Sequence, residues 1–266
     1  MRELDFLQQL LPQVSAFVLK HYHSRENLSY GKQKGVADLV TEADTAAQQM
    51  IESAILKAFP GDLLVGEESG KDQPPADPNA RCWVCDPIDG THNFARGMVP
   101  SWGVSLAFVH GGQTRAAAIA LPGLDDLFLA ADSCPAKRNG KPIRVSTQND
   151  LSESRVEIDF GRPVDRVTCL AVGRYVMEHC GQPRCHGSAV VGLCTVACGA
   201  AEAFVHGGMQ LWDYAAAILI IRKAGGTVTR LDGVDAQVFD GKRGMVASNG
   251  LVHRQILEGI RQSQRG

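Results

Sequence analysis

Residues 85–94 read CDPIDGTHNF and directly follow the apolar run RCWV at 81–84. Asp and Gly are poor strand residues, yet Asp86 and Asp89 stand where a buried strand leaves the core. Pro87 and Ile88 restrict and shield the turn between them. Two close carboxylates in a poorly hydrated place repel each other unless a cation lies between them. Because hard divalent cations prefer oxygen ligands, this turn predicts a Mg²⁺ site.

The residues after the second aspartate predict a phosphate-binding turn. Gly90 allows the backbone to approach a ligand closely. Gly90 and Thr91 can begin a helix, whose first N–H groups bind phosphate oxygens, and the Thr91 hydroxyl can orient a water. Carboxylates for metal beside amides for phosphate indicate metal-assisted phosphoester chemistry. A capped helix after a tight turn is the structural alternative.

Composition excludes several classes of protein. The chain has 266 residues, 44% of them hydrophobic and 21% charged, which is ordinary for a globular protein with a substantial core. The formal net charge is −2, and no run of Lys or Arg exceeds two residues. The sequence therefore disfavours a polybasic groove for nucleic acid or an anionic membrane surface.

The N-terminus and the cysteines predict a cytoplasmic protein. Glu3 and Asp5 interrupt the first residues, so a secretory signal is not expected. The apolar run AAAILII at 215–221 falls far short of the roughly 20 residues that cross a bilayer. Eight scattered cysteines are read as reduced thiols. For the pairs Cys82/Cys85 and Cys194/Cys198, core packing is favoured over a metal site.

Hydrophobic periodicity divides the chain into two halves, 1–145 and 146–266, with the boundary in the turn-rich segment KRNGKPIRVSTQND. The first half begins with an amphipathic helix over 3–22, kinked at Pro12, and a helix that ends near 58. Strand-like runs follow at 63–69, 81–86, 103–109, 114–121 and 125–131. The second half alternates strands with helices near 165–179, 188–198, 213–224 and from 251, which indicates an α/β arrangement.

Four motifs together resemble the inositol monophosphatase family. They are KGVADLVTEAD at 34–44, GEES at 66–69, DPIDGTHNF at 86–94, and LWDYAAA with KAGG at 211–226. This superfamily of Mg²⁺-dependent, lithium-sensitive phosphatases also holds fructose bisphosphatases and phosphoadenosine phosphatases. The resemblance covers nearly the whole chain in the family's order and spacing. It implies a layered α/β/α/β/α sandwich, of mixed α/β (α+β) class, and a homodimer.

The resemblance also implies a ligand set for two ions. Glu67, Asp86 and the backbone carbonyl of Ile88 are expected to bind the first Mg²⁺. Asp86 also bridges to the second ion, which Asp89 and Asp213 complete.

Other site residues take roles by the same resemblance. Glu68 is expected to act on the first site through water, which leaves room for a third ion. Thr91, oriented by Asp44, is expected to position and deprotonate the attacking water. The amides of Gly90 and Thr91 are expected to hold the phosphate.

Substrate choice is expected to depend on other positions. The segment Gly187, Ser188 and Ala189 matches the family segment that lines the sugar or cyclitol ring. His206 stands seven residues before Asp213, where inositol phosphatases typically carry a glutamate. An imidazole accepts at most one hydrogen bond when neutral.

Arg162 falls near the same part of the site. If Arg162 and His206 both face the pocket, the site is more cationic than an inositol-specific one. The hypothesis that follows is a substrate with extra negative charge or a different polyol. A structural histidine and a surface arginine are the alternatives.

The sequence thus predicts a Mg²⁺-dependent phosphomonoesterase that hydrolyses a small phosphorylated polyol or sugar by in-line attack of water. A 3′-nucleotidase-like phosphatase and a histidinol-phosphate phosphatase are alternatives within enzymes. A regulatory relative that binds RNA polymerase or RNA is the alternative from another class. Retention of every metal-ligand position favours chemistry, because a pure binder does not need acids that repel one another.

Overall fold

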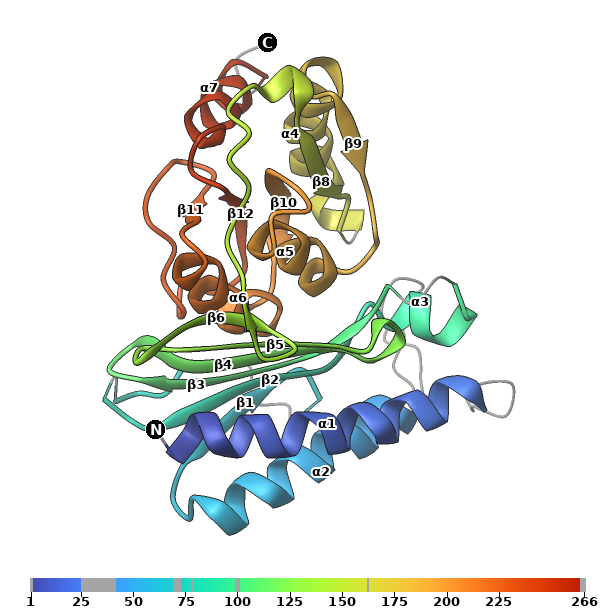
Figure 1. Cartoon of the computed structure of the whole chain (residues 1–266), viewed down its shortest axis with the longest axis vertical. Helices are drawn as coiled ribbons and strands as arrows, with labels where there is room; N and C mark the ends of the chain where they lie inside the picture. The colour runs from blue at the N-terminus through green and yellow to red at the C-terminus, as the bar shows by residue number, and fades with distance from the viewer. Residues whose placement is uncertain are drawn as a thin grey trace.

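The computed structural model describes residues 2–24, 42–68, 73–77, 79–98, 101–161 and 163–263. Within these residues the chain forms five layers, in the order helices, sheet, helices, sheet, helices (Figure 1). The predicted layered sandwich is therefore confirmed. Arg162 and residues 34–41 of the first motif lie outside the described residues.

The first layer is a pair of helices, α1 (Arg2–His23) and α2 (Glu42–Ala58). The apolar residues of α1 recur every three or four positions, so that one face of the helix is buried against the first sheet. The helix continues through Pro12 as one element, where the sequence predicted a kink.

The first sheet has seven strands in sequence order. Its first pair is parallel and all later pairs are antiparallel. The strands are β1 (Leu63–Gly66), β2 (Cys82–Asp89), β3 (Gly103–His110), β4 (Gln113–Leu121), β5 (Asp126–Ala131), β6 (Cys134–Arg138) and β7 (Lys141–Pro142). β7 and the last two residues of β6 lie in the segment KRNGKPIRVSTQND, which the sequence predicted to be turn-rich, and no strand was predicted over residues 134–136, where Pro135 interrupts any strand pattern.

Successive apolar side chains of β2 point to opposite faces of the sheet, so both faces can be covered by other elements. Trp83 and Cys85 belong to the apolar core beneath α1 and α2, whereas Cys82 and Val84 belong to the core on the opposite face. Cys82 and Cys85 therefore point in opposite directions and cannot share a metal ion. All eight cysteines are free thiols, as predicted.

The second sheet has five strands in the order β11-β12-β10-β8-β9. They are β8 (Arg155–Asp159), β9 (Gln182–Arg184), β10 (Ala203–Met209), β11 (Thr227–Arg230) and β12 (Arg243–Ser248). β8 is parallel to both β9 and β10, so these three strands end at the same edge of the sheet.

Four helices cover the second sheet. α5 (Ala189–Ala197) and α6 (Leu211–Lys223) lie between the two sheets, and α4 (Arg166–His179) and α7 (His253–Ser263) cover the outer face (Figure 1). A short helix, α3 (Thr91–Arg96), follows β2. The described residues also include three single 3₁₀ turns: η2 (Pro122–Leu124), η3 (Leu151–Glu153) and η4 (Pro163–Asp165).

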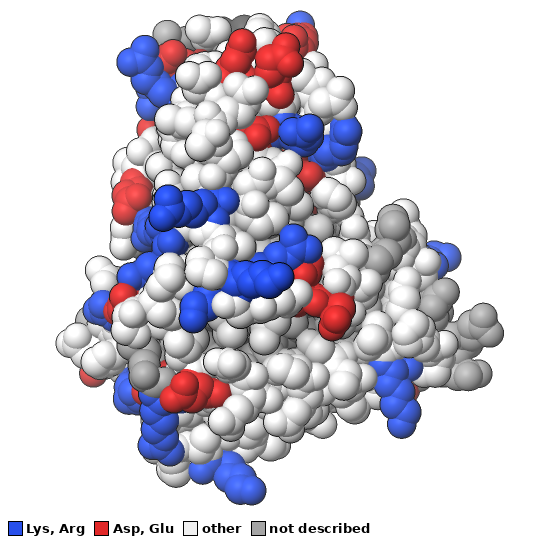
Figure 2. Space-filling view, in the orientation of Figure 1, with Lys and Arg blue, Asp and Glu red and all other residues white. Residues whose placement is uncertain are grey.

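The central apolar core joins both halves of the chain. It contains Val84 and Ile119 of the first sheet together with Tyr214 of α6 and Phe204 of the second sheet. The boundary near residue 145 separates the two sheets, and the division into halves remains an interpretation. On the face in Figure 2, Lys and Arg side chains are interspersed with Asp and Glu. In the described ranges, no helix has both the length and the hydropathy to cross a bilayer.

Candidate metal centre

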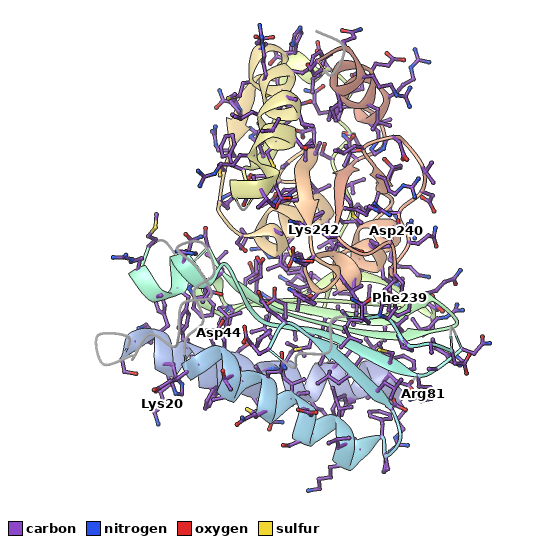
Figure 3. The ribbon with its side chains drawn as sticks, turned by 180° about the vertical axis from the view of Figure 1, so that it is seen from behind. Lys20, Asp44, Arg81, Phe239, Asp240 and Lys242 are labelled. Atoms are coloured by element: carbon purple, nitrogen blue, oxygen red, sulfur yellow. The ribbon has the colours of Figure 1, made fainter. Side chains whose placement is uncertain are left out.

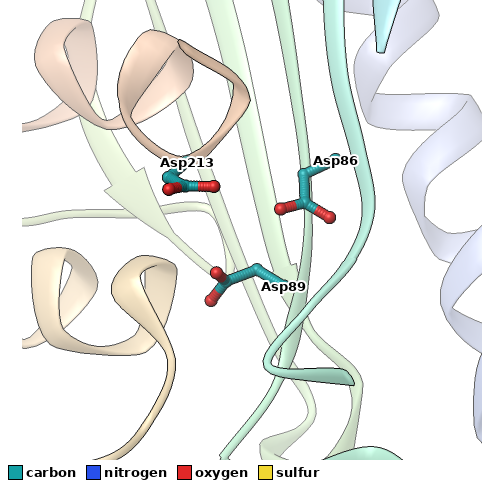
Figure 4. A group of neighbouring side chains, drawn as sticks. All are labelled: Asp86, Asp89 and Asp213. Atoms are coloured by element: carbon teal, nitrogen blue, oxygen red, sulfur yellow. The ribbon is translucent and has the colours of Figure 1, made fainter. Parts of the chain in front are cut away.

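Three aspartates from both halves of the chain meet at one point. Asp86 and Asp89 come from the end of β2, and Asp213 comes from the first turn of α6. One carboxylate oxygen of each lies within 4.8 Å of the others. Figure 4 shows the three side chains turned toward a common space. The sequence predicted this convergence, although Asp213 follows Asp89 by more than a hundred residues.

The two β2 aspartates are held in a poorly hydrated place. Asp86 is 1% exposed, and burial raises its pKa well above the ordinary value, with the charges of Glu67, Asp89 and Asp213 raising it further. Burial also raises the pKa of Asp89, to about 6, although hydrogen bonds from Ser188 and from backbone amides oppose that shift. Two acids with raised pKa values are costly to ionise here without a cation.

The local backbone explains how the turn presents these acids. The Ile88 amide donates to Asp86 Oδ1 at 3.0 Å, and the pairing of β2 with β3 shifts register between Asp86 and Asp89. Gly90 then adopts a left-handed conformation with φ 83°. A Cβ atom there would lie 2.9 Å from the Ser101 carbonyl oxygen, so glycine is needed for both conformation and space.

A hydroxyl and a carboxylate lie beside the aspartates. Thr91 Oγ1 is 3.2 Å from Asp44 Oδ1 and 3.0 Å from the Ile88 carbonyl oxygen. A hydroxyl has one proton, so Thr91 donates to only one of these acceptors at a time. Asp44 is 1% exposed and comes from α2, between that helix and the first sheet (Figure 3). The structure thus brings together the two residues that the sequence paired.

The two glutamates of the GEES motif follow β1. The parallel pairing of β1 with β2 puts the ends of both strands at one edge, where the charge of Glu67 raises the pKa of Asp86. The Glu68 amide donates to Gln48 Oε1 of α2 at 2.9 Å, which holds this segment against the first layer.

The helix start explains the position of Asp213. The Gln210 amide donates to Asp213 Oδ2 at 2.7 Å, which forms part of a capping box, so α6 begins at Leu211 rather than at the predicted 213. Trp212 is 8% exposed and belongs to the central core. The same carboxylate therefore caps a helix and faces the β2 aspartates.

The segment predicted to line the substrate lies against the same centre. Ser188 caps α5 and its hydroxyl donates to Asp89 Oδ2, which also accepts from the Val190 amide at 3.1 Å. Asn93 Nδ2 donates to the carbonyl oxygens of His186 at 2.7 Å and Gly187 at 3.2 Å. α3 and the start of α5 are therefore linked directly.

His206 lies in the second sheet and is 6% exposed. Burial lowers its pKa from the ordinary value, with Asp159 and Asp165 opposing that shift. A neutral imidazole adds no positive charge, so His206 does not support the expectation of a cationic pocket. The other residue in that expectation, Arg162, lies outside the described residues.

Asp159 is a site residue that the sequence reasoning missed. It ends β8, its register partner in β10 is His206, and its charge raises the pKa of Asp89. The signal was present in VEIDF, where an acid ends a strand-like run just as Asp86 does in RCWVCD.

The donor set fits a hard divalent cation. Carboxylates and a backbone carbonyl oxygen are the ligands that Mg²⁺ prefers. Among the described residues, no Lys or Arg forms an ion pair with Asp86 or Asp89. The chemistry of this centre therefore favours a metal ion as the charge that compensates the acids.

Comparison with known proteins agrees with this geometry. The family model described as the inositol monophosphatase family matches residues 2–265. A Thermotoga maritima protein named fructose-1,6-bisphosphatase/inositol-1-monophosphatase is 32% identical over 267 residues, covering 98% of this chain and 97% of its own. The Nus factor SuhB of Escherichia coli strain K12 is 32% identical over 246 residues, covering 92% and 90%.

Solved structures show the same fold. A Thermotoga maritima IMPase is 32% identical with a TM-score of 0.87, and the match covers 100% of this chain and 99% of that one. The extragenic suppressor protein suhB of Bartonella henselae is 29% identical, also with a TM-score of 0.87, and the match covers 97% and 98%.

Proposed function

The chain belongs to the inositol monophosphatase family, and from this premise we propose that it is a Mg²⁺-dependent phosphomonoesterase. Its substrate is a small phosphorylated polyol or sugar. The observation that carries the proposal is the convergence of Asp86, Asp89 and Asp213 within 4.8 Å in a largely buried place. Such a cluster is unfavourable unless a divalent cation is bound.

Two ions share these ligands in the proposal. Glu67, Asp86 and the Ile88 carbonyl hold the first, and Asp86 with Asp89 and Asp213 hold the second. The raised pKa values of the β2 aspartates mean that metal binding displaces protons. Glu68 acts on the first ion through water, and it is the residue that would support a third.

The bound ions supply a water of lowered pKa and neutralise charge on the ester oxygens. Thr91 and Asp44 orient the attacking water, because the hydroxyl lies within hydrogen-bond reach of both the carboxylate and the Ile88 carbonyl. The Gly90 and Thr91 amides hold the phosphate at the start of α3. Gly187, Ser188 and Ala189 line the organic part of the substrate.

A phosphatase screen of the purified protein tests the proposal. The substrates are inositol 1-phosphate, histidinol phosphate, a nucleoside bisphosphate and NADP, each assayed with Mg²⁺, with Mg²⁺ plus Li⁺, and with EDTA. We expect Mg²⁺-dependent release of phosphate, inhibition by Li⁺ and loss of activity in EDTA. Activity that persists in EDTA, or no activity on any ester with Mg²⁺, would contradict the proposal.

The similarity to Nus factor SuhB supports a second candidate, a regulatory role in transcription. An Asp89→Asn variant separates the two. Such a role, measured by complementation of a deletion strain, would survive complete loss of phosphatase activity. If phosphatase activity and complementation are lost together, the regulatory role is not supported.

We also propose that the protein is a homodimer, as the resemblance implies. The outer face of α4 leaves Val167, Leu170 and Met177 exposed by 80%, 55% and 49%, and a second copy could cover these side chains. Light scattering after size-exclusion chromatography would report twice the chain mass of 28.6 kDa. A Leu170→Glu variant should shift that mass toward the monomer if this face forms the interface.

A further inference from the structure

The strand β8 carries a buried acid that plays no part in the proposed reaction. Glu157 is 3% exposed, and its register partner Phe204 belongs to the central core, which also contains α5. The flanking residues Val156 and Ile158 belong instead to the apolar core beneath α4 and α7. Because side chains alternate along a strand, Glu157 points to the face of the sheet that α5 covers.

His186 is the partner of this acid. Its Nδ1 lies 2.8 Å from Glu157 Oε2, and the two side chains are 34% and 5% exposed. An ionised carboxylate can only accept, so Nδ1 carries the proton and donates. Among the described residues, the Glu157 carboxylate forms no other hydrogen bond or ion pair. An unpaired carboxylate at this depth is unfavourable, which favours the conformation in which the ring stays on Glu157.

The contact between the two side chains is charged as well as hydrogen-bonded. The hydrogen bond to Glu157 raises the pKa of His186 above its ordinary value, against the burial of the ring and the charge of Arg184. The protonated imidazole therefore persists to a higher pH than in a free histidine. Hydrogen bonds between charged groups are roughly twice as strong as neutral ones, so the ring is held firmly on β8.

The backbone of the same residue is held by α3. Asn93 Nδ2 lies 2.7 Å from the His186 carbonyl oxygen and 3.2 Å from that of Gly187. Gly187 has φ 67°, and a Cβ atom there would lie 3.3 Å from Asn93 Nδ2. The ring and the backbone of His186 are thus attached to two different elements. These attachments fix the segment that leads into α5.

The residues that follow this segment reach the metal centre. The Ser188 hydroxyl donates to Asp89 Oδ2, and the Val190 amide donates to the same oxygen at 3.1 Å. Two donors on one oxygen fix the orientation of the Asp89 carboxylate. A displacement of the segment would therefore turn Asp89 relative to the other two aspartates, whose ligand atoms lie within 4.8 Å of its own.

We propose that His186 is a positioning residue for the metal centre, with Glu157 as its anchor. The pair fixes the segment that carries Ser188, and the Ser188 hydroxyl orients Asp89 for a divalent cation. This inference rests on the proposed phosphatase function and adds two residues that lie outside the proposed ligand set. Outer residues that orient metal ligands contribute about 10- to 100-fold to metal affinity. His186 acts through Ser188, so we expect the lower end of that range.

Mg²⁺ titrations test the role. The first comparison is between the wild type, His186→Ala and a control, His110→Ala, which removes an exposed imidazole at the end of β3. Two quantities are followed against Mg²⁺ concentration: the rise in Tm over that in EDTA, without substrate, and the initial rate of p-nitrophenyl phosphate hydrolysis. We expect His186→Ala to need about tenfold more Mg²⁺ for the same rise in Tm and for half the maximal rate. The control should match the wild type.

Two further variants assign the effect to the pair. The amide of Asn can take the place of Nδ1 and donate to Glu157, so His186→Asn should stay within about threefold of the wild type. The double variant Glu157→Ala/His186→Ala removes the acid together with its partner and leaves no unpaired carboxylate. It should need about tenfold more Mg²⁺, as His186→Ala does, and it decides the test if His186→Ala does not fold.

The results distinguish this inference from the proposed function. If Mg²⁺ changes neither the Tm nor the rate of the wild type, the proposed phosphatase site fails. If the wild type responds to Mg²⁺ and the double variant needs no more Mg²⁺ than the wild type, the pair only stabilises the fold, whatever the Tm in EDTA. The positioning inference then fails alone. It also fails if His186→Asn is impaired as strongly as His186→Ala, because the hydrogen bond to Glu157 would then not be the cause.

Discussion

Asp86 is the residue of this site whose carboxylate is least favourable to ionise. It is 1% exposed, and four carboxylates act on its pKa, those of Asp44, Glu67, Asp89 and Asp213. Each of these charges raises the free energy of the ionised form. A bound divalent cation attracts each of these carboxylates, and this attraction offsets the repulsion between them. The metal is therefore a condition of the ionised site as well as of the chemistry.

The pH dependence of Mg²⁺ binding follows from these acids. The pKa of Asp89 is about 6 in the folded protein, above its ordinary value, so below that pH the proton competes with the ion. The rise in Tm produced by Mg²⁺ should therefore be small at about pH 5 and should grow toward about pH 7. Thermal scans with Mg²⁺ and with Na⁺ at equal ionic strength measure this difference. A shift that does not change over this range would contradict the account.

Gly90 offers a second test at the residue scale. Gly90→Ala combines a left-handed backbone with a Cβ atom 2.9 Å from the Ser101 carbonyl oxygen. Gly140→Ala is a matched control, because Gly140 has φ 77° with no atom within 4 Å of an added Cβ. We expect the control to lose about 1 kcal/mol of unfolding free energy, and Gly90→Ala about 2 kcal/mol or more together with phosphatase activity.

Chemical denaturation compares the two glycine variants. Equal losses of unfolding free energy would mean that the turn relaxes easily around a side chain. The close packing described for this turn would then be wrong.

At the scale of elements, both sheets present strand ends to the metal centre. β1 leads directly into Glu67, β2 carries Asp86 and Asp89, and β8 ends at Asp159. α5 contributes through its cap, because the Ser188 hydroxyl accepts from the Val191 amide of the helix and donates to Asp89. Rigid elements therefore hold nearly every proposed ligand, which favours a preorganised site.

The strand β12 and the helix α7 are joined by a buried histidine. His253 Nδ1 lies 2.8 Å from Ser248 Oγ, and Nε2 lies 2.9 Å from Thr229 Oγ1. Burial lowers the pKa of His253 to about 4. A lowered histidine pKa means that the unfolded chain binds the proton first. The folded state is therefore destabilised as the pH falls from about 6.5 toward 4.

A His253→Asn variant isolates this effect. The unfolding free energy of the wild type should fall relative to that of the variant by about 3 kcal/mol between pH 7 and pH 4. Urea titrations in EDTA at several pH values measure the difference. A difference that stays constant across this range would show that His253 ionises equally in both states.

At the scale of the whole molecule, the sequence allows the local site to be predicted better than its surroundings. Asp86, Asp89 and Asp213 could be assigned because each stands in a recognisable motif whose chemistry requires a cation. The helices α4 to α7 could be located because their apolar residues follow a helical period. β6 could not, because Pro135 and its charged neighbours pair as an edge hairpin without a hydrophobic pattern.

Asp159 could not be placed beside His206 from the sequence for a different reason. The two residues are neighbours only because β10 pairs in parallel with β8, and the chain between them first forms α4, β9 and α5. Strand order and register depend on the packing of the whole sheet. The substrate side of the site therefore depends on long-range contacts, whereas the metal side depends largely on local motifs.

The central claim is that acids from both halves of the chain form one divalent-cation site that hydrolyses phosphomonoesters. The most direct test is the initial rate of p-nitrophenyl phosphate hydrolysis as a function of Mg²⁺ concentration, for the wild type and for Asp213→Asn. Asn can still accept the Gln210 amide and keep the helix cap, while Asp232→Asn controls for loss of an exposed acid.

We predict a saturable dependence on Mg²⁺ for the wild type and for Asp232→Asn. Asp213→Asn should lower kcat/KM by about 100-fold or more at an unchanged Tm, because it removes a proposed ligand without disturbing the fold. A wild-type rate that is indifferent to EDTA, or an Asp213→Asn variant with full activity, would contradict the account.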